Sequence, residues 1–216
     1  MTSPLLLAQG LRKQVGERRL WQGITLELGA GERLALVGPA GCGKTLLLRQ
    51  LAWLDPLEGG QVRLLGLPPQ AWSLPRYRAQ VAYLAQRPQV FAGTVAQNLD
   101  EPWTYRCHQG RSRQPQRLLA WLEQLGREPT FLGQDAGRLS GGETQLLALL
   151  RLLQLDPVVL LLDEPTASLD GATSLTLEAL LLQWLRGGER ALILTSHDPA
   201  QVERCCDRQL TLGRWV

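Results

Sequence analysis

The chain has 216 residues, of which 44% are hydrophobic and 20% are charged, and its formal net charge is +3. This length suits one large domain, or one domain with a sizeable subdomain, and the apolar content is ample for a core. The basic residues form no long tract, which argues against a dedicated nucleic-acid binder, so we expect no nucleic acid among the partners.

No segment has the pattern of a signal peptide or a membrane span. The apolar run 4–8 is too short for either, and the longest apolar run, 146–155, is interrupted by Arg151. We therefore expect a chain that stays in the cytoplasm and does not itself cross a membrane. The cysteines have neither the spacing of metal ligands nor that of a disulfide framework: Cys42, Cys107, Cys205 and Cys206.

The first part of the chain predicts short strands separated by glycine. Strand signals lie at 5–8, 23–28, 32–37 and 60–65. The glycines at 29 and 31 predict a hairpin-like turn before the strand 32–37.

A phosphate-binding motif follows the strand 32–37 and precedes an apolar run that favours a helix. It reads GPAGCGKT and matches G-x-x-x-x-G-K-[ST]. In such a loop the backbone N–H groups close around nucleotide phosphates, Lys44 reaches the outer phosphates and Thr45 holds Mg²⁺. The predicted phosphate-binding residues are Gly38, Pro39, Ala40, Gly41, Cys42, Gly43, Lys44 and Thr45.

The middle of the chain changes character and predicts a helical subdomain over about residues 88–155. Helical spacing is present in 116–125 and 144–155, with little strand signal between them. Four arginines lie close together between residues 105 and 117, but no alternating aromatic residues accompany them. We interpret this stretch as a solvated loop and helix start rather than a surface that follows phosphates.

Strand signals return at 158–162 and 191–195, separated by a helical stretch at 173–186. This alternation is typical of a parallel sheet. The first of these strands ends in Asp163 and Glu164, at the carboxyl end of a buried strand, where open α/β sheets bind ligands. We expect Asp163 to hold Mg²⁺ together with Thr45, and Glu164 to orient and polarise the attacking water.

Residues 139–143, LSGGE, complete a set of motifs that resembles the ABC-type ATPases over essentially the whole chain. This segment is similar to the signature loop of that family, with Glu143 where glutamine is commoner. Ser140 and the N–H groups of Gly141 and Gly142 begin the predicted helix and offer a site for an anion at its positive end. The resemblance implies that this site faces the γ-phosphate held by the other subunit of a dimer.

The resemblance also implies roles for single residues. Gln86, after the strand 81–85, resembles the glutamine that joins the core to the helical insert and senses Mg²⁺ and water. Asp170 ends a segment, 167–170, similar to the loop that crosses the dimer interface. His197 resembles the switch histidine that contacts the γ-phosphate. The predicted catalytic residues are thus Glu164, His197 and Gln86, and the predicted metal-binding residues are Thr45, Gln86 and Asp163.

Two positions depart from the family pattern. The family usually has an aromatic residue upstream of the phosphate loop that stacks on adenine, but residues 1–20 contain none, and Arg12 stands at the matching place. Its planar guanidinium group can also stack on a ring, so we predict that Arg12 contacts the base. The second departure is Gln145-Leu146, where many relatives have Gln-Arg.

The resemblance implies one ABC-type nucleotide-binding domain over residues 1–216, an α/β P-loop NTPase cassette. Its parts are a parallel core sheet, an N-terminal antiparallel β subdomain and a helical subdomain. Such a chain binds ATP and Mg²⁺, forms a homodimer on ATP binding and powers a separate transmembrane permease from the cytoplasmic face of the inner membrane. Residues 91–103 and the short length resemble the ATP subunit of two-component bacterial iron exporters, which implies export of iron or another metal.

Alternative functions use the same nucleotide site. Relatives in DNA repair insert a long coiled coil between the two motifs, for which residues 45–139 leave no room, and translation factors carry two cassettes. A module that only binds ATP is expected to lack Glu164 or His197. A regulatory or translation-type ATPase stays open as an alternative, as does an exporter of a non-metal substrate such as a nucleotide sugar.

Overall fold

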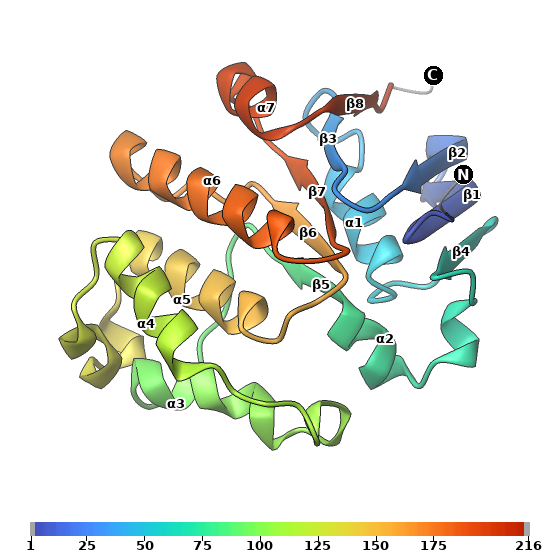
Figure 1. The fold of residues 1–216 in the computed structure, drawn as a ribbon. Helices are drawn as coiled ribbons and strands as arrows, with labels where there is room; N and C mark the ends of the chain where they lie inside the picture. The colour runs from blue at the N-terminus through green and yellow to red at the C-terminus, as the bar shows by residue number, and fades with distance from the viewer. Residues whose placement is uncertain (1–2, 214–216) are drawn as a thin grey trace.

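The structure is a computed structural model that describes residues 3–213, and it contains two sheets and a group of helices (Figure 1). The five-stranded sheet has the order β5-β6-β7-β3-β8, and every neighbouring pair in it is parallel. Its strands are Val81–Leu84 (β5), Val159–Asp163 (β6), Ala191–Thr195 (β7), Arg33–Val37 (β3) and Arg208–Thr211 (β8). The expected parallel core sheet is thereby confirmed.

The second sheet is antiparallel and has the order β2-β1-β4, which confirms the expected N-terminal β subdomain. Its strands are Leu6–Val15 (β1), Arg18–Leu28 (β2) and Gln61–Leu64 (β4). The first two strands are longer than predicted, because the ladder continues through Gly10 with a register shift between Ala8 and Leu11. The hairpin expected at 29–31 is wrong, since β2 and β3 belong to different sheets and this turn carries the chain from one to the other.

The helices lie on both sides of the parallel sheet, and α3, α4 and α5 form a separate group beside it (Figure 1). The α-helices are Lys44–Leu51 (α1), Leu74–Gln80 (α2), Val95–Asp100 (α3), Pro115–Gln124 (α4), Gly141–Leu153 (α5), Gly171–Arg186 (α6) and Pro199–Cys205 (α7). Short 3-10 helices are Pro69–Ala71, Glu101–Thr104, Arg106–His108, Pro129–Gly133 and Ala136–Arg138. Among residues 3–213, no helix has both the length and the apolar character needed to cross a membrane.

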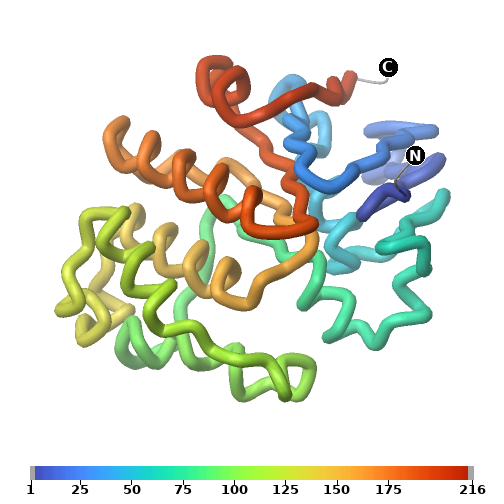
Figure 2. Tube along the Cα trace, viewed as in Figure 1, coloured from blue at the N-terminus to red at the C-terminus, as the bar shows by residue number. Residues whose placement is uncertain are grey.

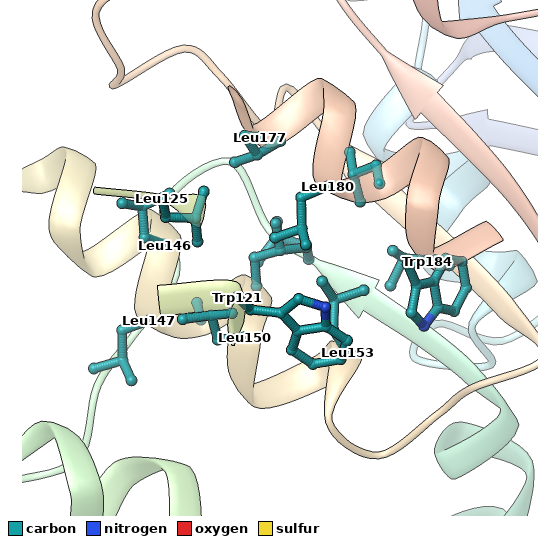
Figure 3. Packing of buried hydrophobic residues seen from close by; sticks show 14 of the residues in the cluster. Trp121, Leu125, Leu146, Leu147, Leu150, Leu153, Leu177, Leu180 and Trp184 are labelled. Atoms are coloured by element: carbon teal, nitrogen blue, oxygen red, sulfur yellow. The ribbon is translucent and has the colours of Figure 1, made fainter. Parts of the chain in front are cut away.

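Two apolar clusters cover the two faces of the parallel sheet. Along β6, Leu160 and Leu162 belong to one cluster and Val159 and Leu161 to the other, as the two-residue period of a strand requires. The first cluster lies between the sheet, α5 and α6, where Figure 3 shows leucines from both helices beside Trp121 and Trp184. Leucines fully buried in such a core each stabilise the fold by about 1.5–3 kcal/mol.

The sheet order brings distant parts of the chain together. In Figure 2 the C-terminal part of the trace runs beside the segment that leads into α1. The registers show why: β8 pairs with β3 from Leu34↔Arg208 to Val37↔Thr211, and β7 separates β3 from β6. Because the strands are parallel, the loops that follow β3, β5, β6 and β7 all leave from one edge of the sheet.

Candidate functional site

The phosphate-binding motif lies between β3 and α1, as predicted from the sequence. Lys44 is 8% exposed, and its Nζ donates hydrogen bonds to the carbonyl oxygens of Gly38 (2.9 Å) and Pro39 (3.4 Å). The ammonium group therefore lies across the loop to which it belongs. Thr45 is exposed in the first turn of α1.

Two glycines of this loop are required by close packing as well as by backbone conformation. Gly43 has φ 95°, and a Cβ atom there would lie 2.1 Å from Cζ3 of Trp21 on β2. Gly38 has φ 151°, and its Cβ would lie 2.4 Å from the carbonyl oxygen of Leu212. The loop is thus held between the antiparallel sheet and the last strand of the parallel sheet.

Asp163 ends β6 with its carboxylate inside the protein. The residue is 3% exposed, and its two oxygens accept hydrogen bonds from Tyr83 Oη (3.0 Å) and Thr195 Oγ1 (2.9 Å). Burial, followed by the nearby Asp163 carboxylate, raises the pKa of Tyr83 well above its ordinary value, so the phenol keeps its proton and donates it. These contacts come from β5 and β7 on either side of β6 and fix the carboxylate at the sheet edge.

Glu164 is joined to both of the other residues that we predicted to be catalytic. Its Oε2 accepts a hydrogen bond from Gln86 Nε2 (2.9 Å), and its Oε1 lies 2.8 Å from His197 Nε2. The side chain of Glu164 is 17% exposed and that of His197 is 60% exposed. Both residues line a cavity of about 320 Å³. The structure therefore brings Gln86, Glu164 and His197 together at one solvent-accessible place.

The backbone at Glu164 is strained. Its φ of 50° lies in the left-handed region, which non-glycine residues rarely adopt. The N–H of Glu164 donates to Thr195 Oγ1 (3.0 Å), and the same hydroxyl donates to Asp163. One threonine of β7 thus holds both carboxylate residues in place. Strain of this kind persists where surrounding contacts determine the conformation, and it is concentrated at functional sites.

The signature segment begins helix α5 with a reciprocal cap. Ser140 Oγ accepts a hydrogen bond from the N–H of Glu143 (3.2 Å), while Glu143 Oε2 accepts from the N–H of Ser140 (3.0 Å). Glu143 Oε1 also pairs with Arg127 (3.1 Å). The hydrogen bonds from Ser140 hold the pKa of Glu143 below its ordinary value. The helix begins at Gly141 rather than at the predicted residue 144, so Gly141 and Gly142 both lie in its first turn.

The signature segment and the phosphate loop are separate within one chain. In the described part of the chain, no hydrogen bond or ion pair joins residues 140–142 to residues 38–45. The signature instead packs on the segment that follows Glu164, since a Cβ at Gly142 would lie 3.0 Å from the carbonyl oxygen of Ser168. Asp170 ends that segment and caps α6, accepting hydrogen bonds from Thr173 N (2.9 Å) and Oγ1 (2.7 Å).

Arg12 lies on β1 beside a cavity of about 230 Å³ that Arg19, Trp21 and Glu58 also line. Sequence reasoning missed Trp21, a residue that is 1% exposed and whose ring packs on Gly43. The Trp21 side chain therefore lies between this cavity and the phosphate loop. The available signal was that Trp21 is the first aromatic residue of the chain, directly after the segment that lacks one.

The arginine-rich stretch is occupied with contacts inside the protein. Arg111 donates to the carbonyl oxygen of Leu155 (2.6 Å), Arg113 pairs with Asp100, and Arg117 lies 3.4 Å from Asp156. These contacts attach the segment before α4, and α4 itself through Arg117, to α3 and to the residues that follow α5. They support the interpretation of the stretch as a loop and helix start rather than a surface that follows phosphates.

The second departure from the family pattern, Gln145-Leu146, lies in the core of the helical group. Leu146 is fully buried in the cluster of Figure 3, so an apolar residue suits this position of α5.

The four cysteines are free thiols, and burial raises the pKa of Cys205 and of Cys206 to about 12. Among residues 3–213, no group of three or more histidine, cysteine and acidic side chains is arranged to hold a metal ion.

The fold and this site define a nucleotide-binding cassette of the P-loop class. The sequence model described as "ABC transporter" matches residues 21–167. The chain belongs to this family, in which it is an ATP-binding subunit that hydrolyses ATP. Such cassettes dimerise and act together with membrane permeases.

Three known proteins illustrate the similarity. The chain is 34% identical to "Probable iron export ATP-binding protein FetA" of Escherichia coli (strain K12), covering 97% of this chain and 92% of that protein. It is 31% identical to "Fe(3+) ions import ATP-binding protein FbpC 1" of Rhodococcus jostii (strain RHA1), covering 94% of this chain but only 58% of the relative. The ATP-binding cassette MJ0796, solved as a dimer with ADP and Pi, has the same fold, with a TM-score of 0.83 over 96% of this chain and 94% of that one at 24% identity.

Proposed function

We propose that the chain uses ATP hydrolysis to drive export of iron or another metal through a separate membrane permease, bound to the cytoplasmic face of the inner membrane. The observation that carries the hydrolytic part is the arrangement of Gln86 and His197 around Glu164. The proposed cargo rests on the similarity to FetA and on the segment 91–103.

The phosphate loop and Asp163 are the proposed nucleotide and magnesium site. When ATP binds, Lys44 exchanges the carbonyl oxygens of Gly38 and Pro39 for phosphate oxygens. Asp163 is buried and forms no ion pair within residues 3–213, and an unpaired buried carboxylate favours a nearby cation. Its oxygens, the Thr45 hydroxyl and the Gln86 amide oxygen are hard donors that suit Mg²⁺, which neutralises charge on the phosphates.

Glu164 is the proposed general base. The oxygen of a water molecule bonds to the γ-phosphorus while the bond from that phosphorus to the bridging oxygen breaks, and the water proton passes to Glu164. Gln86 and His197 hold the two carboxylate oxygens, so the carboxylate has one orientation. His197 is also exposed enough to reach the γ-phosphate. The products are ADP and phosphate.

A second copy of the chain is the proposed source of the remaining phosphate contacts. The start of α5 offers the Ser140 hydroxyl and the N–H groups of Gly141 and Gly142, but these do not contact the phosphate loop of their own chain. In a homodimer formed on ATP binding, they complete the site on the partner, and Asp170 lies in the segment that crosses the interface. The dimeric MJ0796 cassette supports this proposal.

An apolar cavity beside Phe91 is the proposed docking surface for the permease. The cavity of about 350 Å³ lies between α2 and the start of the helical group, where Phe91 is 49% exposed and Tyr105 is 44% exposed. Asn98 bonds both the N–H (2.7 Å) and the carbonyl oxygen (2.9 Å) of Phe91, so the backbone that presents the ring is fixed. Phe91 is thus not a core residue, and its segment leads directly from Gln86.

The trapped dimer tests the hydrolytic and dimeric parts together. Glu164→Gln removes the base but keeps the magnesium ligands, so it should abolish hydrolysis and accumulate a dimer with Mg-ATP, measured by light scattering. Lys44→Ala should lose nucleotide binding and stay monomeric. A Glu164→Gln protein that is monomeric at saturating Mg-ATP would contradict the proposed dimer.

The cargo has its own test. Deleting the gene should raise cellular iron and sensitivity to peroxide, and rescue should require both Lys44 and Glu164. Unchanged iron in the deletion strain under iron excess would remove the iron proposal and leave the transporter ATPase. A nucleotide sugar then becomes the next cargo to assay. Copurification with a membrane protein distinguishes a transporter subunit from a stand-alone regulatory or translation-type ATPase, which would purify alone.

A further inference from the structure

A buried polar network connects the segment after Glu164 to the helix after His197. Gln201 on α7 is 2% exposed, and its Nε2 donates to Thr166 Oγ1 (2.9 Å) and to Glu178 Oε1 (3.1 Å). Thr166 lies two residues after Glu164, and Gln201 lies four residues after His197. The one amide therefore contacts both segments that carry the catalytic pair.

The base of this network is an ion pair between α6 and α7. Arg204 donates to both oxygens of Glu178, with Nε at 2.7 Å and Nη2 at 2.9 Å, and the Glu178 side chain is 5% exposed. The hydrogen bonds that Arg204 donates to Glu178 raise the pKa of Arg204 above its ordinary value, so the guanidinium stays charged. Asp198, next to His197, caps α7 and lies 3.8 Å from Arg204. The start of α7 is thus fixed to α6.

We propose that Gln201 is a positioning residue for hydrolysis, which sets the place of His197 relative to Glu164 through its hydrogen bond to Thr166. The inference rests on the proposed roles of Glu164 and His197. The geometry gives the reason: His197 Nε2 and Glu164 Oε1 meet at 2.8 Å, but they belong to different loops, and the contact between Gln201 and Thr166 ties those loops together behind the catalytic pair. Arg204 holds the Glu178 carboxylate through two hydrogen bonds, and this carboxylate accepts a hydrogen bond from the Gln201 amide, so the amide cannot turn away from Thr166.

The energetic argument follows from burial. A glutamine amide at this depth has lost its hydrogen bonds to water, so the contacts with Thr166 and Glu178 are favoured over an unpaired amide. The network therefore has a single satisfied arrangement, and it transmits that arrangement to both loops. Displacing a catalytic group by about 1 Å can slow a reaction by about a hundredfold.

The test uses two substitutions that break the same hydrogen bond from opposite sides, Gln201→Leu and Thr166→Val, alone and combined. We expect each single variant to lower the kcat for ATP about tenfold or more, with KM and the affinity for a fluorescent ATP analogue changed less than about twofold. The double variant should lose no more than Gln201→Leu alone, because Gln201→Leu already removes the contact that Thr166→Val breaks. Thr166→Ser keeps the hydroxyl group, so its kcat should stay close to that of the parent.

Gln154→Leu is the matched control for lost stability. Gln154 is a half-buried glutamine at the end of α5 that bonds Leu99 and Trp103, away from the catalytic pair. It should lower the melting temperature but leave kcat unchanged. A folded Gln201→Leu or Thr166→Val protein with kcat within twofold of the parent, a loss confined to KM, or additive losses in the double variant would overturn the inference. If Glu164→Gln still hydrolyses ATP, the proposed base itself is wrong and the inference falls with it; if Glu164→Gln is inactive, a negative result at Gln201 concerns the network alone.

Discussion

The hydroxyl of Ser140 donates a hydrogen bond of 2.8 Å to Oε2 of Glu143, in the first turn of helix α5, which begins within the signature segment. A carboxylate thus occupies the positive end of α5, where a phosphate of the partner would bind in the proposed dimer. Because its pKa lies below the ordinary value, Glu143 remains charged at neutral pH. The cap that stabilises the helix start therefore opposes a second anion at the same place.

Removing this charge should strengthen the ATP-bound dimer. Glu143→Gln keeps a capping side chain of the same size. A charge at a helix end contributes about 0.3–1 kcal/mol and the homodimer has two such sites, so we expect the dimer dissociation constant to fall by up to about thirtyfold. Light scattering measures this dissociation constant for the Glu164→Gln protein with and without Glu143→Gln. Glu123→Gln on α4 is the control for a general change in net charge. Equal or weaker dimerisation of Glu143→Gln than of this control would show that the carboxylate does not oppose the nucleotide.

The packing of Trp21 on Gly43 predicts which glycines of the phosphate loop tolerate substitution. Gly43→Ala should abolish ATP binding, because the new methyl group would lie within 2.1 Å of the indole ring. Gly41→Ala is the control: Gly41 has a similarly left-handed φ of 72°, but no atom lies within 4 Å of a Cβ built there. The Gly41→Ala substitution should then cost only about 1 kcal/mol, from backbone strain alone. Calorimetric titration with ATP compares the two, and equal losses would mean that backbone strain, not the indole, decides.

Arg12 should support adenine by stacking. Arg12→Tyr should keep or tighten ATP affinity, whereas Arg12→Ala should weaken it by about 1 kcal/mol. Arg18→Ala, an exposed arginine of β2 outside the cavity, is the control for lost positive charge. The affinities for ATP and GTP measured side by side report on the base. If all four proteins bind alike, Arg12 does not contact the base.

The exposed ring of Phe91 should be needed for transport but not for folding. Phe91→Asp should leave ATP binding by the isolated chain unchanged and should prevent copurification with the permease, because a carboxylate in an apolar contact must be desolvated. Leu119→Asp is the matched control, since Leu119 is 43% exposed on α4 outside this cavity. Transport that stays coupled in a folded Phe91→Asp protein would rule out the docking role.

An ion pair between β3 and the start of β8 should make stability depend on pH. Arg33 donates to Asp207, and this hydrogen bond holds the pKa of Asp207 below its ordinary value of 3.8. The folded state therefore gains stability above pH 3.8 and loses it as the pH falls through the lowered pKa. Because both side chains are partly exposed, Asp207→Asn should lower the free energy of unfolding at pH 7 by at most about 1 kcal/mol. Urea unfolding at a series of pH values should show that the difference in free energy of unfolding between the parent and Asp207→Asn vanishes in acid. A difference that does not depend on pH would contradict this role of the ion pair.

Much of the site follows from local sequence because its motifs are local. The phosphate loop needs only a strand, three glycines and a lysine in order, and Asp163 and Glu164 are placed by the end of one buried strand. The contacts of Glu164 with Gln86 and His197 depend instead on which strands are neighbours, and a single chain pattern does not contain that order. For these two residues the family resemblance supplied what periodicity could not.

The features that sequence reasoning missed share a physical cause. Helix α7 is seven residues long and β8 four, so neither develops a clear period, and both are stabilised by tertiary contacts. Gln201 has no motif, since its role comes from being buried against Thr166 and Glu178. The turn at 29–31 was misread because glycines report a change of direction but not whether the next strand joins the same sheet.

The contact of Gly38 with Leu212 has a consequence for synthesis of the chain. The N–H of Leu212 bonds the carbonyl oxygen of Val37 (2.8 Å), and β8 supplies the outer neighbour of β3. A nascent chain that ends before residue 208 has the complete motif for phosphates but lacks one wall of the loop. We therefore expect ATP to stabilise such a nascent chain less than it stabilises the complete fold. The full stabilising effect of the nucleotide should then appear late in synthesis, after β8 has paired with β3.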